Sequence, residues 1–200
     1  EFILVQASAH VKPKGEVRVD AVLGPGHVTA ITGAAAWEFL PRDYGVPCAV
    51  AGFEPLDVLQ AVLALAECHT ARSPRVANAY SRGVTAGGNQ VAQALMERVF
   101  TISPAQWRGL GVIPASGQAL SETYAAHDAR RRFEDLLTAA EGQAQEPHGC
   151  RCGEVLRGAL TPPACGLFGR ACTPEHPLGP CMVSGEGACA AHYHYGDDLL

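Results

Sequence analysis

The sequence lacks several features that would assign it to large classes of protein. No apolar stretch approaches the ~18 residues that a membrane-spanning helix requires, and no basic region followed by an apolar stretch opens the chain as an export signal would. No dense run of Lys or Arg occurs, and the net charge is -5, so the electrostatic basis for binding a phosphate backbone is missing. We therefore expect a soluble, cytoplasmic protein that binds neither membrane nor nucleic acid.

The chain also lacks an initial methionine, internal repeats and long low-complexity tracts. It opens on Glu1-Phe2-Ile3-Leu4-Val5, as though it entered partway along an apolar strand, and we expect it to be a fragment of a longer protein. A length of 200 residues with 48% hydrophobic residues is enough for one medium domain with a core and a small appendage.

Strand-like and helix-like segments alternate through the first two-thirds of the chain. Strands are predicted at residues 17–23, 46–52 and 110–113, and helices at 28–40 (beginning near Gly33), after Asp57, at 89–100 and at 120–140. This alternation favours an α/β fold with a parallel sheet. We predict a Rossmann-like lobe over residues 1–140 that ends in a long helix.

The composition changes after this helix. A polar linker is predicted at residues 141–147, and the remainder is dense in Gly, Pro and Cys with few periodic apolar positions. Such a segment buries little apolar surface by itself, so a metal centre is expected to hold it together. We predict a small irregular Cys-rich domain over residues 141–200.

Six of the eight cysteines fall within 40 residues of this second region. In a reducing compartment this crowding indicates metal or redox chemistry more than a disulfide framework. Thiolates suit both iron-sulfur clusters and zinc, and the absence of any C-x-x-C pair weakens the case for a zinc ribbon. An iron-sulfur cluster, a zinc site and a set of structural disulfides or inert thiols all stay open. The six are Cys150, Cys152, Cys165, Cys172, Cys181 and Cys189.

Polar side chains also follow the predicted strands. His27 and Glu54 each come after a strand, at the edge where open α/β sheets bind ligands, so both are candidates for a cleft. A structural turn is an equally good interpretation of His27. Asp57 is expected to cap the helix that follows it. A polar set that anchors a helix entry is expected at Asn78, Tyr80 and Arg82.

Several motifs occur in a specific order along the chain. They are Gly24-Pro25-Gly26-His27-Val28, Gly52-Phe53-Glu54-Pro55-Leu56-Asp57, Trp107-Arg108-Gly109, Ile113-Pro114-Ala115-Ser116-Gly117, Gly149-Cys150-Arg151-Cys152-Gly153 and Glu186-Gly187-Ala188-Cys189-Ala190. Together they resemble the HypD-type NiFe-hydrogenase maturation factors, over nearly all of the chain from about Val17. That family has two α/β lobes and a C-terminal cluster region. The resemblance implies that this chain supplies the second lobe and the cluster region, and that the first lobe is missing.

The resemblance also implies a division of labour among the thiols. Cys150, Cys165, Cys172 and Cys189 match the four ligands of a 4Fe-4S cluster, whereas Cys152 and Cys181 match a neighbouring redox dithiol. In the family, a transient Fe(CN)2CO group is assembled with a HypC-type chaperone, and a HypE-type partner delivers cyanide. The cluster and the dithiol would relay electrons, so the implied role is that of a redox-active scaffold and not of a conventional enzyme.

Two departures from the family pattern leave other functions open. The family's Cys-Gly-Gly-His segment is absent from this sequence, and His127 stands where Phe is typical. The alternatives are a structural zinc module for protein docking and an inactive, truncated remnant.

Overall fold

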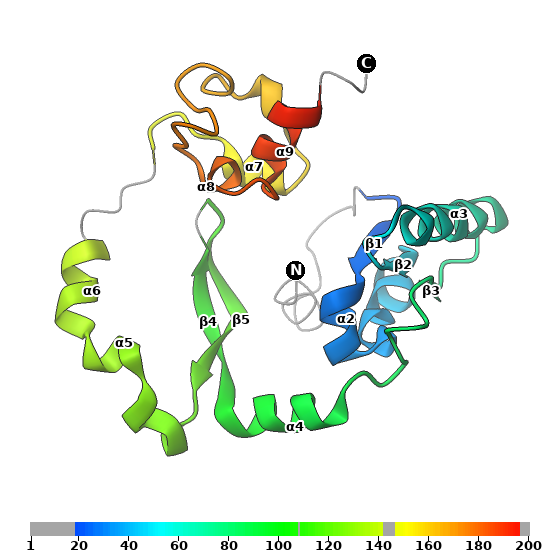
Figure 1. Ribbon diagram of the computed structural model, residues 1–200, viewed down its shortest axis with the longest axis horizontal. Helices are drawn as coiled ribbons and strands as arrows, with labels where there is room; N and C mark the ends of the chain where they lie inside the picture. Colours follow the sequence, from blue (N-terminus) through cyan, green and yellow to red (C-terminus); the bar gives the residue numbers. More distant parts are fainter. Residues whose placement is uncertain (1–18, 108, 142–146, 197–200) are drawn as a thin grey trace. The chain divides into compact units, whose positions relative to one another are not determined.

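The computed structural model describes residues 19–107, 109–141 and 147–196 (Figure 1). They fall into two compact units. The first takes in residues up to Pro104 together with Pro114–Ala126, and the second takes in Ala105–Ile113 and the residues from His127 onward. The predicted domain boundary at residue 140 stays a prediction. The opening segment 1–18 and most of the predicted linker, residues 142–146, lie outside the described residues.

The first unit contains a three-stranded parallel sheet, which confirms the α/β prediction. Its strands are β1 (Val22–Pro25), β2 (Cys48–Ala51) and β3 (Val76–Asn78), in the order β1-β2-β3. The second predicted strand is therefore confirmed as β2. The third predicted strand, at residues 110–113, is confirmed as a strand from Gly111 onward, because these residues begin β5 (Gly111–Leu120). Its expected place in the parallel sheet is wrong, because β5 pairs with β4 in a separate two-stranded sheet.

The central strand β2 carries a core on each face of the sheet. Its residues alternate between the faces, as the pleat of a strand requires. Cys48 and Val50 pack in one cluster, with Trp37, while Ala49 and Ala51 pack in the other. The second cluster includes Ala61 from α3 (Pro55–Ala71), the helix that follows β2. All four residues of β2 are buried, so the strand is predicted well by its apolar run.

The helix predicted to begin near Gly33 instead ends there. Helix α2 covers Gly26–Thr32, and Gly33 follows it with a φ of 84°. A side chain at Gly33 would collide with the carbonyl oxygen of Ala86, so this position requires glycine. A 3-10 helix (Ala34–Trp37) and a π-helical turn (Leu40–Tyr44) carry the chain on toward β2.

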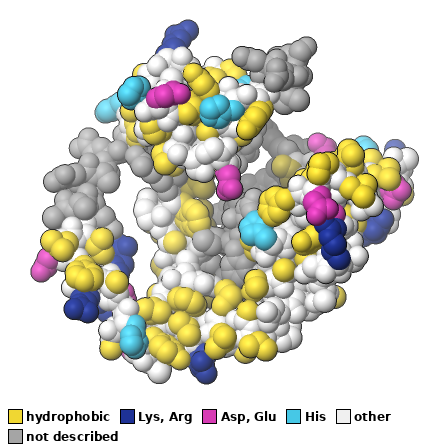
Figure 2. All heavy atoms as spheres, viewed as in Figure 1, with side chains coloured by type: hydrophobic (Ala, Val, Ile, Leu, Met, Phe, Trp, Pro, Cys, Tyr) yellow, Lys and Arg dark blue, Asp and Glu magenta, His cyan; other side chains and the backbone are white. Residues whose placement is uncertain are grey.

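Helix α4 (Gln90–Val99) confirms the helix predicted at residues 89–100. Its N-cap is Asn89, whose side chain accepts a hydrogen bond of 3.0 Å from the backbone N–H of Ala92. The predicted apolar stripe is nevertheless exposed, with Val91 72% and Leu95 45% accessible. Figure 2 shows hydrophobic side chains gathered over this helix.

A β-hairpin follows α4 directly. It consists of β4 (Phe100–Trp107) and β5 (Gly111–Leu120). The backbone N–H of Ser121 donates to the carbonyl of Val99 at 2.8 Å, and the Thr101 hydroxyl lies 3.4 Å from the carbonyl oxygen of Ala119. These two contacts indicate antiparallel pairing.

The long helix predicted at residues 120–140 is divided in the structure. Leu120 ends β5, and it is followed by a 3-10 helix (Glu122–His127), then α5 (Ala129–Arg132) and α6 (Glu134–Glu141). The Asp128 carboxylate accepts hydrogen bonds from the backbone N–H groups of Arg130 and Arg131 at 2.9 and 3.3 Å. An Asp in this role starts a new helix, which explains why the apolar periodicity does not give one continuous helix.

Short helices joined by loops make up residues 147–196. They are α7 (Cys152–Leu156), a 3-10 turn (Pro162–Ala164), α8 (Pro180–Val183) and α9 (Ala188–Tyr195). A small core of Cys172, Met182 and Ala190 lies among them. Within the described ranges, no helix combines the length and the apolar character needed to cross a membrane.

Candidate functional site

Six cysteines line one cavity in the second unit. They are Cys150, Cys152, Cys165, Cys172, Cys181 and Cys189. Helices α7, α8 and α9 carry one each near their starts, and loops carry the other three. The rest of the lining is Val155, Leu167, Phe168, Gly179 and Met182, so no charged side chain borders the cavity. The fold of residues 147–196 thus brings together all the thiols that the sequence singled out.

Two of these thiols form a close pair. The Sγ atoms of Cys152 and Cys181 lie 2.8 Å apart, although the residues are 29 positions apart in sequence. Both side chains are buried, and neither residue is in a disulfide. Burial, followed by the contact with Cys152, raises the pKa of the Cys181 thiol. Two thiols in this arrangement can be oxidised to a disulfide with little movement, because the S–S bond length is about 2.05 Å.

The other four thiols influence one another electrostatically. Burial raises the pKa of Cys189 to about 11, and neighbouring thiols add to the effect. These neighbours are Cys152, Cys165, Cys172 and Cys150. The pKa of Cys150 is likewise raised by burial first, with contributions from three cysteines of the same cavity. Loss of the thiol protons is therefore unfavourable unless a positive centre compensates the charges.

Backbone groups pack closely around the sulfur atoms. A Cβ atom at Gly179 would lie 2.5 Å from the Sγ of Cys150, so the absence of a side chain leaves room for that sulfur. The backbone N–H of Leu178 points at the Sγ of Cys172 at 3.4 Å. Hydrogen bonds of this kind stabilise a thiolate ligand. A Cβ at Gly187 would collide with the carbonyl oxygen of Cys181, so this side of the cavity is equally closely packed.

The chemistry of the thiols can be compared with what a single ion and a larger inorganic centre require. A tetrahedral zinc ion needs sulfur atoms about 2.3 Å from one point, and hence about 3.8 Å from each other. Among the residues that the structure describes, no three His, Cys, Asp or Glu side chains meet in this way. The cavity between the sulfurs is small, about 20 Å³, so the sulfurs would have to move outward to admit an inorganic core. The donor chemistry, four thiolates and an apolar wall, suits an iron-sulfur cluster.

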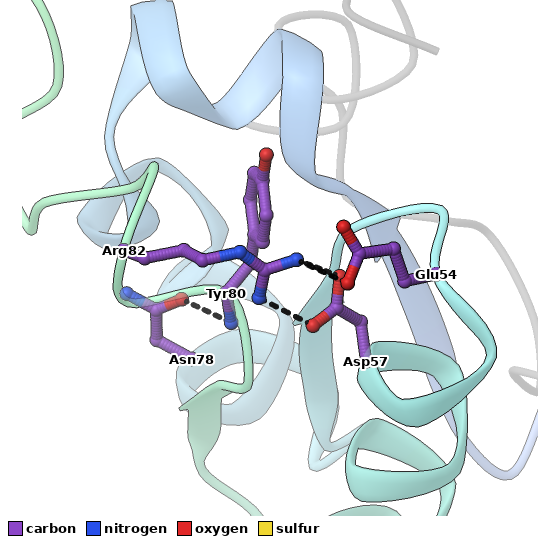
Figure 3. A network of polar contacts seen from close by, with 5 residues as sticks. All are labelled: Glu54, Asp57, Asn78, Tyr80 and Arg82. Atoms are coloured by element: carbon purple, nitrogen blue, oxygen red, sulfur yellow. Dashed lines mark hydrogen bonds and ion pairs between the residues drawn. The ribbon is translucent and has the colours of Figure 1, made fainter.

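A second group of polar residues lies beyond the carboxyl ends of the parallel strands (Figure 3). The Arg82 guanidinium donates to both carboxylate oxygens of Asp57, at 2.6 and 2.7 Å. It also forms an ion pair of 3.2 Å with Glu54 and lies 4.5 Å from the centre of the Tyr80 ring. The Arg82 hydrogen bonds lower the pKa of Asp57, a residue only 2% exposed. The prediction that Asp57 caps α3 is wrong, because Glu54 occupies the N-cap position and Asp57 lies in the first turn.

Both predicted cleft residues lie at this edge of the sheet. The ring of His27, at the start of α2, is 5.1 Å from the ring of Phe53, which follows β2. Glu54 is exposed, and Arg82 is its ion-pair partner. The Asn78 side chain accepts a hydrogen bond from the backbone N–H of Tyr80 at 3.0 Å, and so supports the loop that carries Arg82. These side chains therefore form a network of contacts at this edge of the sheet. The contacts do not identify a ligand that would bind there.

The sequence did not predict the residues that support these sites without themselves being candidates to bind a metal or substrate. Arg82 was expected only to help anchor a helix, and the spacing of 25 residues hides its pairing with Asp57. Gly179 directly precedes Pro180-Cys181. This Gly-Pro-Cys sequence is the feature that could have indicated a glycine packed against the sulfur atoms. His192 and His194 lie in helix α9, where the His192 ring contacts Phe168.

Comparison with known proteins agrees with the sequence motifs. The family described as "HypD: Hydrogenase formation hypA family" matches residues 2–196. The hydrogenase maturation factor HypD of Azotobacter vinelandii is 47% identical over 183 residues, which cover 91% of this chain and 47% of that protein. The proteins of the same name from Cupriavidus necator and Escherichia coli are each 44% identical, over 94% and 88% of this chain and 49% and 47% of their own lengths. The chain spans about half the length of these relatives, and it belongs to the HypD family.

Proposed function

We propose that this chain handles electrons during the maturation of a NiFe-hydrogenase. In this proposal Cys150, Cys165, Cys172 and Cys189 hold a 4Fe-4S cluster, and Cys152 with Cys181 is a redox dithiol beside it. The observation that carries the proposal is that all six thiols line one cavity with no charged side chain. Family membership supports the general role, because the relatives are named hydrogenase maturation factors.

The protein's own groups would prepare the site in three ways. Four thiols supply the anionic sulfur ligands that a cluster requires, and such a cluster transfers one electron at a time when bound. Leu167, Phe168 and Met182 exclude water from the sulfurs. The N–H of Leu178 stabilises the charge on Cys172. The second thiol pair, with its sulfurs 2.8 Å apart, can store two electrons by opening and closing one S–S bond.

The wider role follows from the family and belongs to the same proposal. The chain would act with a HypC-type chaperone, and receive cyanide from a HypE-type protein, during assembly of an Fe(CN)2CO group. All eight cysteines are free thiols in the structure, the state in which the proposed cluster ligands and the dithiol would act. Because the chain covers about half of its relatives, scaffolding of the iron group is expected to need the remaining half of such a protein.

A structural zinc module is the rival function. It would need four donors around one point, and among the described side chains no group of three is already placed to hold a metal, so the thiols would have to move to bind zinc as they would to bind a cluster. It would also give no role to the Cys152–Cys181 pair. The close Cys152–Cys181 pair and the family's motifs support the iron-sulfur proposal, and metal analysis can test it independently.

Serine variants of the six thiols separate the two roles. Cys150→Ser, or the same change at Cys165, Cys172 or Cys189, should lower the iron content of the anaerobically loaded chain, because a cluster ligand is lost. Cys152→Ser and Cys181→Ser should retain the iron, and should abolish hydrogenase maturation when placed in a complete family member. Full maturation with both dithiol variants would refute the redox role. Cys68→Ser is the matched control, because Cys68 lies on α3 outside this cavity.

A further inference from the structure

The cavity that holds the six thiols adjoins a second, polar cavity. The second one measures about 160 Å³. It is lined by Gly109, Pro147, Cys150, Arg151, Cys152, Gly153, Glu154, Arg157 and Pro180. Cys152 borders both cavities, as does the proposed cluster ligand Cys150, whereas Cys181 borders only the inner one. The two members of the close thiol pair therefore differ in what they face, although their exposed fractions, 4% and 5%, are nearly equal.

The polar cavity has the chemistry of an entry route for a thiolate. Arg157 donates from Nε to the carbonyl of Gly153 at 2.9 Å, and this bond holds its side chain along the cavity wall. Arg151 donates from Nε to the Glu154 carboxylate at 2.8 Å. The two guanidinium groups outnumber the one carboxylate, so the lining carries a net positive charge. Positive charge favours the approach of an incoming thiolate.

The backbone fixes the wall between the two cavities. A Cβ atom at Gly153 would collide with the carbonyl oxygen of Gly109, so α7 and the hairpin tip are in close contact just after Cys152. On the other side of the pair, a Cβ at Gly187 would collide with the carbonyl of Cys181, which leaves Cys181 backed by protein. The approach to the pair through the polar cavity thus leads to Cys152 first.

We propose that Cys152 is the thiol that exchanges with an external dithiol, and that Cys181 is the inner thiol; this rests on the dithiol role proposed above. One thiolate of the external dithiol attacks the Sγ of Cys152 in the Cys152–Cys181 disulfide. The new S–S bond joins the external sulfur to Cys152, and Cys181 leaves as a thiolate. The second external thiolate then attacks the first external sulfur and releases Cys152. Two electrons and two protons pass from the external dithiol, which becomes a disulfide, to the cysteine pair.

Single-cysteine accessibility tests this order. Cluster-loaded Cys181→Ser, which retains Cys152, and Cys152→Ser, which retains Cys181, are treated anaerobically with the aromatic disulfide 5,5'-dithiobis(2-nitrobenzoate). Release of the coloured thiol gives the rate, and peptide masses identify the labelled cysteine. Because access controls the exchange rate, Cys152 should react about tenfold faster or more. Equal rates, or faster labelling of Cys181, would overturn the proposal.

The charge of the cavity gives a second test. The reagent is an anion, so Arg157→Gln should slow its reaction with Cys152 about threefold, with little effect on the neutral reagent 2,2'-dithiodipyridine. Arg170→Gln is the matched control, because Arg170 lies in the same unit but outside both cavities. If Arg157→Gln and Arg170→Gln behave alike, the polar cavity is not the route. Iron and sulfide are measured on the same samples, so failure to bind a cluster is recognised separately from a wrong order of the thiols.

Discussion

The Arg82 guanidinium donates two hydrogen bonds to the buried Asp57 carboxylate, at 2.6 and 2.7 Å. This pair joins the loop after β3 to the first turn of α3. Asp57 is nearly inaccessible, and without Arg82 it would be a buried carboxylate with no counter-charge. A buried, unpaired charge is strongly unfavourable. The ion pair is therefore central to how the sheet edge is organised, and it gives a prediction with a defined pH dependence.

Arg82→Gln should lower the denaturant midpoint of the chain at neutral pH. The pKa of Asp57 is lowered by Arg82, so the stabilisation is fully present above the unfolded-state pKa, about 3.9, and is lost as the pH falls through the folded-state value. The difference between the native chain and the variant should accordingly shrink below about pH 4. Denaturation curves collected from pH 3 to pH 7 measure it.

Arg42→Gln provides the comparison for this change. Arg42 pairs with Asp43 on the surface, and exposed pairs contribute little to stability. Its midpoint should match that of the native chain throughout the range. A midpoint for Arg82→Gln that stays equally low at every pH would contradict the assignment of the effect to Asp57.

Gly179→Ala should weaken metal loading by a steric effect alone. Gly179 has φ -91° and ψ 152°, a conformation that alanine adopts without strain, so its Cβ contact with the Cys150 sulfur is the only problem. Residues that support metal ligands typically contribute tenfold to a hundredfold in affinity, and we expect a loss of about tenfold. Iron titration followed by visible absorption measures it.

Gly185→Ala is the matched control for this substitution. A Cβ at Gly185 meets no atom within 4 Å, so the variant should load iron as the native chain does. Unchanged iron affinity in Gly179→Ala would mean that the Cys150 sulfur does not occupy the position on which the proposed ligand set depends.

Met182→Ala should destabilise the cysteine-containing unit. Met182 is 2% exposed and packs against Cys172 and Ala190, and removal of a buried Met side chain costs about 2–5 kcal/mol. Unfolding of the loaded chain in denaturant, monitored through its visible absorption, should begin at lower denaturant concentration. The next residue, Val183, is 65% exposed, so Val183→Ala should change the free energy of unfolding by less than about 0.5 kcal/mol. Equal effects of the two substitutions would show that the small core does not stabilise the site.

Local patterns predicted the parts of this fold that depend on local interactions. The apolar run gave β2, and Asn89 marked the start of α4. The helix over residues 120–140 failed because Leu120 pairs in a hairpin and Asp128 starts a new helix, so tertiary pairing and capping outweigh periodicity. Similarly, the strand that completes the parallel sheet is only three residues long, β3, and too short to leave a pattern.

The candidate sites were likewise predictable only in part. The density of cysteines correctly indicated which residues lie together, because all six thiols of this Gly- and Pro-rich segment line one cavity. Their uneven spacing did not predict that Cys152 would lie 2.8 Å from Cys181, since successive cysteines at steps of 13, 7, 9 and 8 positions allow many pairings. For the same reason the Asp57–Arg82 pair was not predictable from sequence separation.

The most direct test of the account is the metal and sulfide content of the native chain after purification without oxygen. The proposed ligand set of Cys150, Cys165, Cys172 and Cys189 predicts brown protein with about four irons and four acid-labile sulfides per chain. The colour should persist in Cys152→Ser and disappear in Cys150→Ser. One zinc per chain, with no labile sulfide and no visible absorption, would contradict it.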